Sequence, residues 1–568
     1  MQKFVEIFSK AVSDKISELY SVCVTEQEIA DMLEYPPDPK MGDVALPCFK
    51  LSRTLRKAPP QIASDLKDGI EIKNAKKIEA VSGYLNAFIS DAHFVSSTLS
   101  DMLARGDDFG KLSEGVGKTM CIDYSSPNMA KRFHIGHLGT TAIGNSIKRI
   151  HEFSGYNCVG INHLGDWGTQ YGRLAVAYSK WGSREEVEKL GVKELERIYQ
   201  KFYIEAENDP SLNDEARAAF TKMENGDREL LEIWEWFREI SLREFMKTYN
   251  LLGIDFESYS GESFYNDKMD AVVEELREKG LLVESEGAMI VPLDDYNMPP
   301  CIILKSDGST IYATRDITAA LYRKKTYNFD KCVYVTDAGQ SLHFAQFFKV
   351  IGLMGYDFEK DMVHVPYGKV SIGGQKLATR AGNAVLLTEL FDEAISRVRA
   401  VIDEKNPDCE NKEEIARKVG VGAVIFNQLS AGRIKDINFI WEDALNFDGN
   451  TGPYVQYTYA RACSVIEKAG ESTALSDSAT LSDEEKEMLN VLSRFPERVK
   501  QALDEYEPSV ISRYLLDVCH AFNRFYHNCP ILRATDEEKS TRVAICKVTK
   551  SVIGNGLWLI GMEKTEKI

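Results

Sequence analysis

TMCIDYSSPNMAKRFHIGHL, at residues 119–138, is the most informative segment of this 568-residue chain. Its first six residues are predicted to form a buried strand, which breaks at a Ser/Pro/Asn turn. A helix is then expected to begin with two histidines one turn apart, His134 and His137, around Gly136. The N–H groups at a helix start and two imidazoles on one face suit nucleotide phosphates. Gly136 has no side chain, which leaves room for a flat base against the backbone.

A second glycine-rich segment, GDWGTQYG at residues 165–172, follows the next strand-like run at 157–162. Ligands of open parallel sheets bind at the carboxyl ends of the strands, so both turns are expected to open onto one crevice. Strands and helices alternate from residue 118 to about 438, which predicts a doubly wound parallel sheet. The candidate strands of this sheet lie at 158–161, 288–292, 301–304, 331–335 and 363–365.

The remaining segments predict two further domains and one insertion. Residues 1–107 contain helices and short strands around 81–89 and end in a polar linker at 105–108. A charged helical insertion at about 183–252 interrupts the α/β domain, residues 108–445. Its stripe of Leu230, Ile233, Trp234, Phe237 and Ile240 is interpreted as core packing. Residues 446–568 read as helical to the end.

Composition excludes several classes of protein. Hydrophobic residues make up 44% and charged residues 27%, as in ordinary globular proteins. No apolar run approaches the ~20 residues of a membrane span, and the N-terminus reads as an amphipathic helix, so a cytoplasmic protein without membrane contact is expected. The eleven cysteines form no CxxC pair, which argues against disulfides and structural zinc. No carboxylate cluster predicts a protein-bound metal.

The motifs FHIGHL and NHLGDWGTQYG together resemble those of a class I aminoacyl-tRNA synthetase, and specifically an arginyl-tRNA synthetase. The resemblance continues, in the family's order, through GES at 261–263, YATRD at 312–316, GQSLHFAQFF at 339–348, KLATRAGNAV at 376–385 and GNTGPYVQYTYAR at 449–461. It implies a Rossmann-type catalytic domain, an N-terminal α+β module and a C-terminal all-α anticodon-binding bundle.

The resemblance also implies a reaction. The carboxylate of L-arginine would attack the α-phosphate of ATP, accompanied by Mg²⁺, and the arginyl group would then pass to tRNA(Arg). His134, Gly136 and His137 would bind ATP, with the histidines catalytic. The family's mobile KMSKS loop corresponds to Lys376, Leu377, Ala378, Thr379 and Arg380, of which Lys376, Thr379 and Arg380 are the expected ATP contacts. Because Thr379 replaces the second lysine of the motif, Lys131 is the expected catalytic substitute.

Recognition of arginine requires carboxylates that face a planar guanidinium. By resemblance, Asp316 would pair with the guanidinium, with Tyr312 on the same side if the segment is helical. Glu262 and Asn128 would hold the α-amino group, and Gln340 would help to fix the substrate. From the residues alone, a salt bridge from Asp316 to Arg315 or Arg323 explains the aspartate better than a functional role does.

Two regions are expected to contact tRNA despite a net charge of −18. One region is a basic cluster, formed by Lys50, Arg53, Arg56 and Lys57. From the residues alone it is interpreted as a solvated helix face. The resemblance instead favours contact with the outer corner of the tRNA. In the C-terminal bundle, exposed aromatics could stack on anticodon bases. The candidates are Tyr454, Tyr457, Tyr459 and Tyr526, with Tyr457 and Tyr526 preferred. A monomer is expected.

Two alternatives remain. A non-catalytic tRNA-binding paralogue would be expected to lose the histidines or the pocket carboxylates, and this chain retains both. A nucleotidylyltransferase also uses an HxGH turn, but it is usually much smaller and has no use for a terminal helical bundle.

Overall fold

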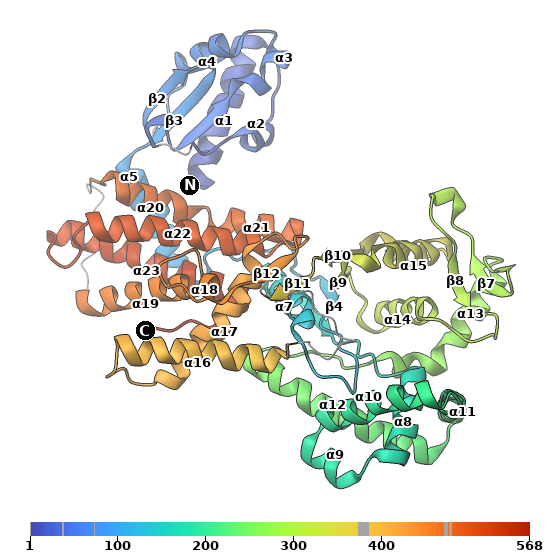
Figure 1. The fold of residues 1–568 in the computed structure, drawn as a ribbon. Helices are drawn as coiled ribbons and strands as arrows, with labels where there is room; N and C mark the ends of the chain where they lie inside the picture. The colour runs from blue at the N-terminus through green and yellow to red at the C-terminus, as the bar shows by residue number, and fades with distance from the viewer. Residues whose placement is uncertain (1, 37–38, 73, 373–384, 471–474, 476–479) are drawn as a thin grey trace.

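The computed structural model describes residues 2–36, 39–72, 74–372, 385–470, 475 and 480–568. Figure 1 shows an N-terminal module set apart from the rest, a central α/β body with helical and β-sheet extensions, and a C-terminal helical bundle. Within the described ranges, no helix is long and apolar enough to cross a membrane.

The N-terminal module is built on an antiparallel sheet with the strand order β1-β3-β2. The apolar side chains Phe4, Phe8, Val12 and Ile16 recur every four residues along α1 and are fully buried, so one stripe attaches this helix to the core. The strands are β1 (Val44–Pro47), β2 (Ala75–Val81) and β3 (Tyr84–Ile89). The helices are α1 (Gln2–Tyr20), α2 (Glu26–Met32), α3 (Ser52–Leu55) and α4 (Pro59–Lys67).

The connection to the catalytic body is packed against the C-terminal bundle. It comprises α5 (Asp91–His93), the π-helical turn Phe94–Leu99, α6 (Ser100–Arg105) and the 3-10 turn Gly106–Asp108. Asp107 accepts hydrogen bonds from Ser551 Oγ at its carboxylate and from Asn555 Nδ2 at its carbonyl, both at 2.9 Å. The polar residues of this segment therefore contact protein.

A four-stranded parallel sheet forms the centre of the catalytic body, in the order β10-β9-β4-β5. The helix α7 (Leu138–Phe153) connects β4 to β5, and α15 (Ser341–Leu353) connects β9 to β10. These crossovers bring the carboxyl ends of the strands to one edge. The strands are β4 (Thr119–Asp123), β5 (Asn157–Ile161), β9 (Lys331–Asp337) and β10 (Met362–Tyr367).

Two of the predicted strands lie outside this sheet, so their assignment to it was wrong. β7 (Ala288–Val291) and β8 (Cys301–Leu304) join β6 (Val283–Ser285) in a separate antiparallel sheet. The connection between β7 and β8 is too short for the crossover of a dozen or more residues that parallel neighbours require. α13 (Met269–Glu278) precedes this sheet and α14 (Tyr312–Tyr327) follows it, returning the chain to β9.

The predicted apolar stripe of the helical insertion belongs to the hydrophobic core, and the ring of Phe237 packs edge-on against that of Tyr178. Phe237 and Ile240 are buried, while Leu230, Ile233 and Trp234 are partly buried against the same core. The helices are α8 (Thr169–Trp181), α9 (Arg184–Leu190), α10 (Val192–Asn208), α11 (Ser211–Glu224) and α12 (Arg228–Leu252).

The last part of the chain is all-helical, as predicted. Its helices are α19 (Gly452–Ala469), α20 (Asp483–Ser493), α21 (Phe495–Glu505), α22 (Ser509–Asn528) and α23 (Asp536–Leu559). The helices α16 (Leu387–Lys405), α17 (Lys412–Ser430) and α18 (Trp441–Ala444) lead into it. The short parallel pair β11 (Val370–Ile372) and β12 (Ile437–Phe439) lies at the border with the catalytic body.

Candidate active site and RNA-binding surfaces

The loop after β4 has an unusual backbone for non-glycine residues. Ser125, Ser126 and Ala130 have positive φ values of 69°, 44° and 58°. A non-glycine residue in this region costs about 1–3 kcal/mol and persists only where its surroundings fix it. Here Ser125 N donates to Thr140 Oγ1 at 2.9 Å, and Ala130 N donates to Ser241 Oγ at the same distance. The loop is therefore strained and held from both sides.

A buried ion pair lies beneath this loop. Arg323 of α14, only 1% exposed, donates from Nη2 to Asp123 Oδ2 at 2.7 Å. Ser126 Oγ donates to the other oxygen of Asp123 at 2.8 Å, and His163 N donates to Ser126 Oγ at 3.1 Å. This chain of contacts connects α14, the end of β4 and the loop after β5.

The two glycine-rich turns lie side by side, as expected for one crevice. Asn128 and Gly165 form a parallel bridge, with Met129 N donating to Gly165 O at 3.1 Å. A Cβ atom at position 165 would lie 2.1 Å from Asn128 Oδ1, so glycine at this position leaves room for the asparagine side chain as it is placed here. Asn128 itself is exposed.

The two histidines precede the helix, so the prediction that the helix begins with them was wrong. His134 adopts an extended conformation and caps the 3-10 turn Ile135–His137, and α7 begins only at Leu138. The imidazoles are nevertheless adjacent, with ring centroids 4.0 Å apart. A Cβ at Gly136 would lie 2.8 Å from Cε1 of His134, so the glycine makes room for this ring.

Both imidazoles favour the neutral form. Burial lowers the pKa of His134, with a smaller contribution from the charge of Lys131, and burial lowers the pKa of His137 to about 3. Gly136 N donates to Nδ1 of His134 at 3.1 Å. Nδ1 is thus an acceptor, and the proton of the neutral ring sits on Nε2. His134 can therefore donate a hydrogen bond to an anion without carrying a charge.

Lys131 and Arg132, which precede the histidines, differ in their surroundings. Arg132 is bound to Glu196 of the insertion through both Nε and its backbone N–H. Lys131 is exposed, and none of the residues that the structure describes holds its ammonium group in a hydrogen bond or ion pair. Within the described part of the chain, Lys131 is therefore an unpaired cation whose charge acts on both histidines.

The acidic side of the crevice is organised by Asp166, which sequence reasoning missed although it lies in the quoted GDWG motif. Fully buried, Asp166 pairs with Arg238 at 3.1 Å and accepts hydrogen bonds from the N–H and hydroxyl of Ser263 at 2.8 and 2.9 Å. Asp166 thereby holds the GES turn and its Glu262 in place. Burial raises the pKa of the Glu262 carboxyl to about 7, opposed by Arg315, whose Nη1 is 3.6 Å from Oε1.

Asp316 lies one turn after Tyr312 on α14, as predicted for a helical segment. Its carboxylate contacts His343 Nε2 at 2.6 Å, and the same imidazole packs edge-on against Tyr312 with centroids 5.1 Å apart. The suggested salt bridges of Asp316 to Arg315 or Arg323 are absent from the described structure, because those arginines pair with Glu262 and Asp123. His343 was missed, although GQSLHFAQFF contains it.

Gln340 ends the 3-10 turn Ala338–Gln340 after β9 and is exposed next to the start of α15. Lys376, Thr379 and Arg380 lie outside the described residues. The segment that follows them is bound to the histidine turn: Ile135 N donates to Val385 O at 3.1 Å, and Leu387 N to Phe133 O at 2.8 Å. Among the described residues, no three His, Cys, Asp or Glu side chains gather as metal ligands.

The basic cluster of the N-terminal module is only partly available. Lys50 pairs with Glu34 at 3.2 Å, and Lys57 pairs with Asp65 at 2.9 Å. Arg53 and Arg56 are exposed, and within the described ranges neither has an ion-pair partner. The two arginines are therefore the free cations of the cluster.

A pocket of about 760 Å³ opens at the end of the C-terminal bundle, between α19, the end of α22 and the loop that follows it. Tyr457 and Tyr526, 39% and 43% exposed, line this pocket. The guanidinium of Arg461 lies over both rings, at 4.7 and 5.2 Å from their centroids. Tyr459, in contrast, is buried in the core. Flat surfaces and a cation are thus presented together, as single-stranded RNA binding requires.

Comparison with known proteins gives consistent matches along the chain. Residues 98–441 match the family model "tRNA synthetases class I (R), catalytic domain", residues 6–89 the "Arginyl tRNA synthetase N terminal domain", and residues 455–568 the "DALR anticodon binding domain".

Whole proteins match as well. The chain is 50% identical to the arginine--tRNA ligase of Alkaliphilus metalliredigens, over 98% of this chain and 99% of that one. It is 51% identical to the arginine--tRNA ligase of Clostridium botulinum strain Alaska E43, over 95% and 96%. Its fold is similar to Thermus thermophilus arginyl-tRNA synthetase, with a TM-score of 0.81, 25% identity and 99% coverage of each chain. Its fold is also similar to the arginyl-tRNA synthetase of Plasmodium falciparum, with a TM-score of 0.79 and 25% identity over 100% of this chain and 99% of that one.

Proposed function

The chain belongs to the class I arginyl-tRNA synthetases, and we propose where in the molecule its reaction takes place. It catalyses the ATP-dependent ligation of L-arginine to tRNA(Arg). Both chemical steps are assigned to the crevice at the carboxyl ends of β4, β5 and β9. A carboxylate oxygen of arginine attacks the α-phosphorus of ATP, pyrophosphate leaves, and the terminal adenosine of the tRNA then accepts the arginyl group. The pair of adjacent, half-buried histidines beside the exposed Lys131 is the observation that carries this proposal.

ATP is assigned to the histidine side of the crevice. His134 and His137 would donate to the phosphate oxygens, with Gly136 leaving the backbone accessible. Lys131 supplies a mobile positive charge where negative charge develops. Lys376, Thr379 and Arg380 would close over the same phosphates, which is supported by the attachment of residues 385 and 387 to the histidine turn. Mg²⁺ would arrive with ATP as part of the substrate.

Arginine is assigned to the acidic side. Asp316, oriented by His343, would pair with the guanidinium, and Tyr312 and Gln340 would border it. Glu262 and Asn128 would bind the α-amino group. Because the acidic groups of this side are buried or held by neighbours, they can be desolvated against a cationic substrate without rearrangement.

Two surfaces are assigned to tRNA. Arg53 and Arg56, with Lys50 and Lys57 beside them, would bind backbone phosphates, whereas Tyr457 and Tyr526 would stack on unpaired bases. One chain carries the crevice and both surfaces, which supports a monomer as the active form. We place this monomer in the cytoplasm, where tRNA is charged.

Amino-acid-dependent pyrophosphate exchange in the presence of cognate tRNA tests the assignment. Only arginine is expected to support exchange. Asp316→Asn keeps the shape of the pocket but removes one partner of a charged pair, an effect of about 2–5 kcal/mol. The KM for arginine should therefore rise about thirtyfold or more, since 1.4 kcal/mol is about tenfold, while the KM for ATP stays within twofold. An unchanged KM for arginine would make Asp316 a structural residue.

A further inference from the structure

The loop between α22 and α23 forms one wall of the pocket at the end of the bundle. Pro530, Ile531, Leu532 and Arg533 all line the pocket. Pro530, Leu532 and Arg533 are exposed, whereas Ile531 and the preceding Cys529 are buried. Because four consecutive residues of the loop line the pocket, the backbone path of the loop decides how their side chains are presented to it. A group that fixes this backbone therefore fixes the wall.

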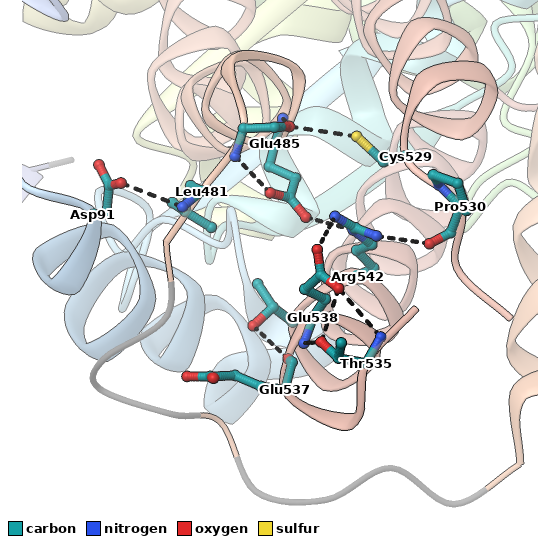
Figure 2. A network of polar contacts seen from close by, with 11 residues as sticks. Asp91, Leu481, Glu485, Cys529, Pro530, Thr535, Glu537, Glu538 and Arg542 are labelled. Atoms are coloured by element: carbon teal, nitrogen blue, oxygen red, sulfur yellow. Dashed lines mark hydrogen bonds and ion pairs between the residues drawn. The ribbon is translucent and has the colours of Figure 1, made fainter. Parts of the chain in front are cut away.

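Arg542, in the second turn of α23, is such a group. Its Nη1 donates to the carbonyl oxygen of Pro530 at 2.7 Å, its Nε to Glu485 Oε1 at 2.7 Å, and its Nη2 to Glu538 Oε1 at 3.0 Å (Figure 2). The residue is 9% exposed and Glu485 is 2% exposed. A planar guanidinium donates from three nitrogens held apart in a rigid plane, so it can reach acceptors that lie far from one another, whereas an ammonium group donates from a single nitrogen.

Both carboxylates that bind Arg542 are themselves fixed. Glu485 accepts from the backbone N–H of Ser482 at 2.7 Å in the capping box of α20, and Glu538 forms the corresponding box with Thr535 at the start of α23. Ser482 Oγ also lies 3.4 Å from Cys529 Sγ. As Figure 2 shows, the guanidinium thus joins two capped helix starts to the pocket loop.

We propose that Arg542 is a positioning residue for tRNA recognition, holding Leu532 and Arg533 in place against an unpaired base and its phosphate. The inference rests on the proposed binding of RNA in this pocket. Arg542 is not among the residues that line the pocket, so it acts through the carbonyl of Pro530 and not by touching RNA.

Two substitutions separate this role from a general contribution to folding. Arg542→Lys keeps a positive charge beside Glu485 but cannot also hold Pro530, so the loop is released while the buried carboxylate stays paired. Glu485→Gln removes the charge of the pair but leaves the hydrogen bond to Pro530 intact. If Arg542 positions the pocket, only the first substitution affects RNA binding.

Steady-state aminoacylation and amide hydrogen exchange of residues 529–535 provide the readouts. For Arg542→Lys, we expect the KM for tRNA to rise roughly tenfold, the effect of losing one charge-assisted hydrogen bond, and amides of the loop to exchange faster. kcat and the KM values for arginine and ATP should stay within twofold. Glu485→Gln should leave the KM for tRNA and the exchange of the loop unchanged.

The proposal would be overturned if the two substitutions changed the KM for tRNA equally. It would also be overturned if Arg542→Lys left either that KM or the hydrogen exchange of the loop unchanged. Tyr457→Ala and Tyr526→Ala test the pocket itself. If these two raise the KM for tRNA and Arg542→Lys does not, the positioning role fails and the RNA pocket stands. If neither tyrosine substitution affects tRNA binding, the RNA assignment fails, whatever loop exchange shows for Arg542.

Discussion

Burial raises the pKa of the Glu262 carboxyl group to about 7, so this group titrates near neutral pH. In the proposed site, the ionised form pairs with the α-ammonium group of arginine, so arginine binding requires loss of the proton. The KM for arginine should therefore be nearly constant above about pH 7 and rise toward tenfold per pH unit below it. Steady-state kinetics between about pH 6 and 8 would measure this, and Glu262→Gln should give a flat profile. A wild-type profile as flat as that of the variant would remove Glu262 from the arginine site.

Lys131 offers the second test at the level of single residues. If its ammonium stabilises the phosphates in the activation step, Lys131→Ala should lower the single-turnover rate of activation by about 10²–10³ and leave tRNA binding nearly unchanged. Thr379→Lys should partly rescue Lys131→Ala, because a lysine from the loop would serve the same phosphates, and should have little effect in the wild type.

Such non-additivity is expected when two groups share one role. Arg132→Ala is the matched control for general disturbance of the loop, because Arg132 is bound to Glu196 and not free. Strictly additive effects of the Lys131 and Thr379 substitutions would exclude the shared role.

At the scale of elements, the buried pair of Arg323 and Asp123 joins α14 to β4 and, through Ser126, supports the strained loop. Removing one partner leaves an uncompensated buried charge, so Arg323→Met should lower the free energy of unfolding by about 3–5 kcal/mol. The exposed pair of Arg277 and Glu274 gives the control, because Arg277→Met should cost less than about 1 kcal/mol. Chemical denaturation would measure both. Equal, small effects would mean that the buried pair does not hold these elements together.

The sequence predicted the helices and strands better than the contacts between them. The strand at residues 119–123 and the terminal helices are local, so their composition and spacing were sufficient. The contacts of Asp123 with Arg323 and of Asp166 with Ser263 span 200 and 97 residues, and no local pattern encodes them. β7 and β8 were misassigned for the same reason, because an apolar run specifies a strand but not its neighbours. His134 took an extended, capping conformation that helical spacing could not reveal.

At the scale of the whole molecule, one helix connects the two proposed sites. α16 begins at Leu387, whose N–H is bound to Phe133 beside the histidines, and it ends next to Asn406, which lines the pocket of the bundle. Its 19 residues span about 28 Å at 1.5 Å per residue. Because a packed helix moves as a unit, RNA in the pocket and the position of the histidine turn can be coupled through this helix.

The resemblance to arginyl-tRNA synthetases implies that activation of arginine depends on tRNA, and α16 offers a route by which bound RNA could act on the crevice. Arginine-dependent pyrophosphate exchange should appear only with cognate tRNA, because the RNA would shift α16 and the crevice into their active arrangement. An RNA hairpin that carries only the acceptor stem should not support exchange, since it leaves the pocket empty. An anticodon stem-loop added in trans should then restore part of the exchange. Robust exchange without any RNA would contradict the prediction. Full exchange with the acceptor hairpin alone would instead locate the requirement in the crevice and exclude a role for α16.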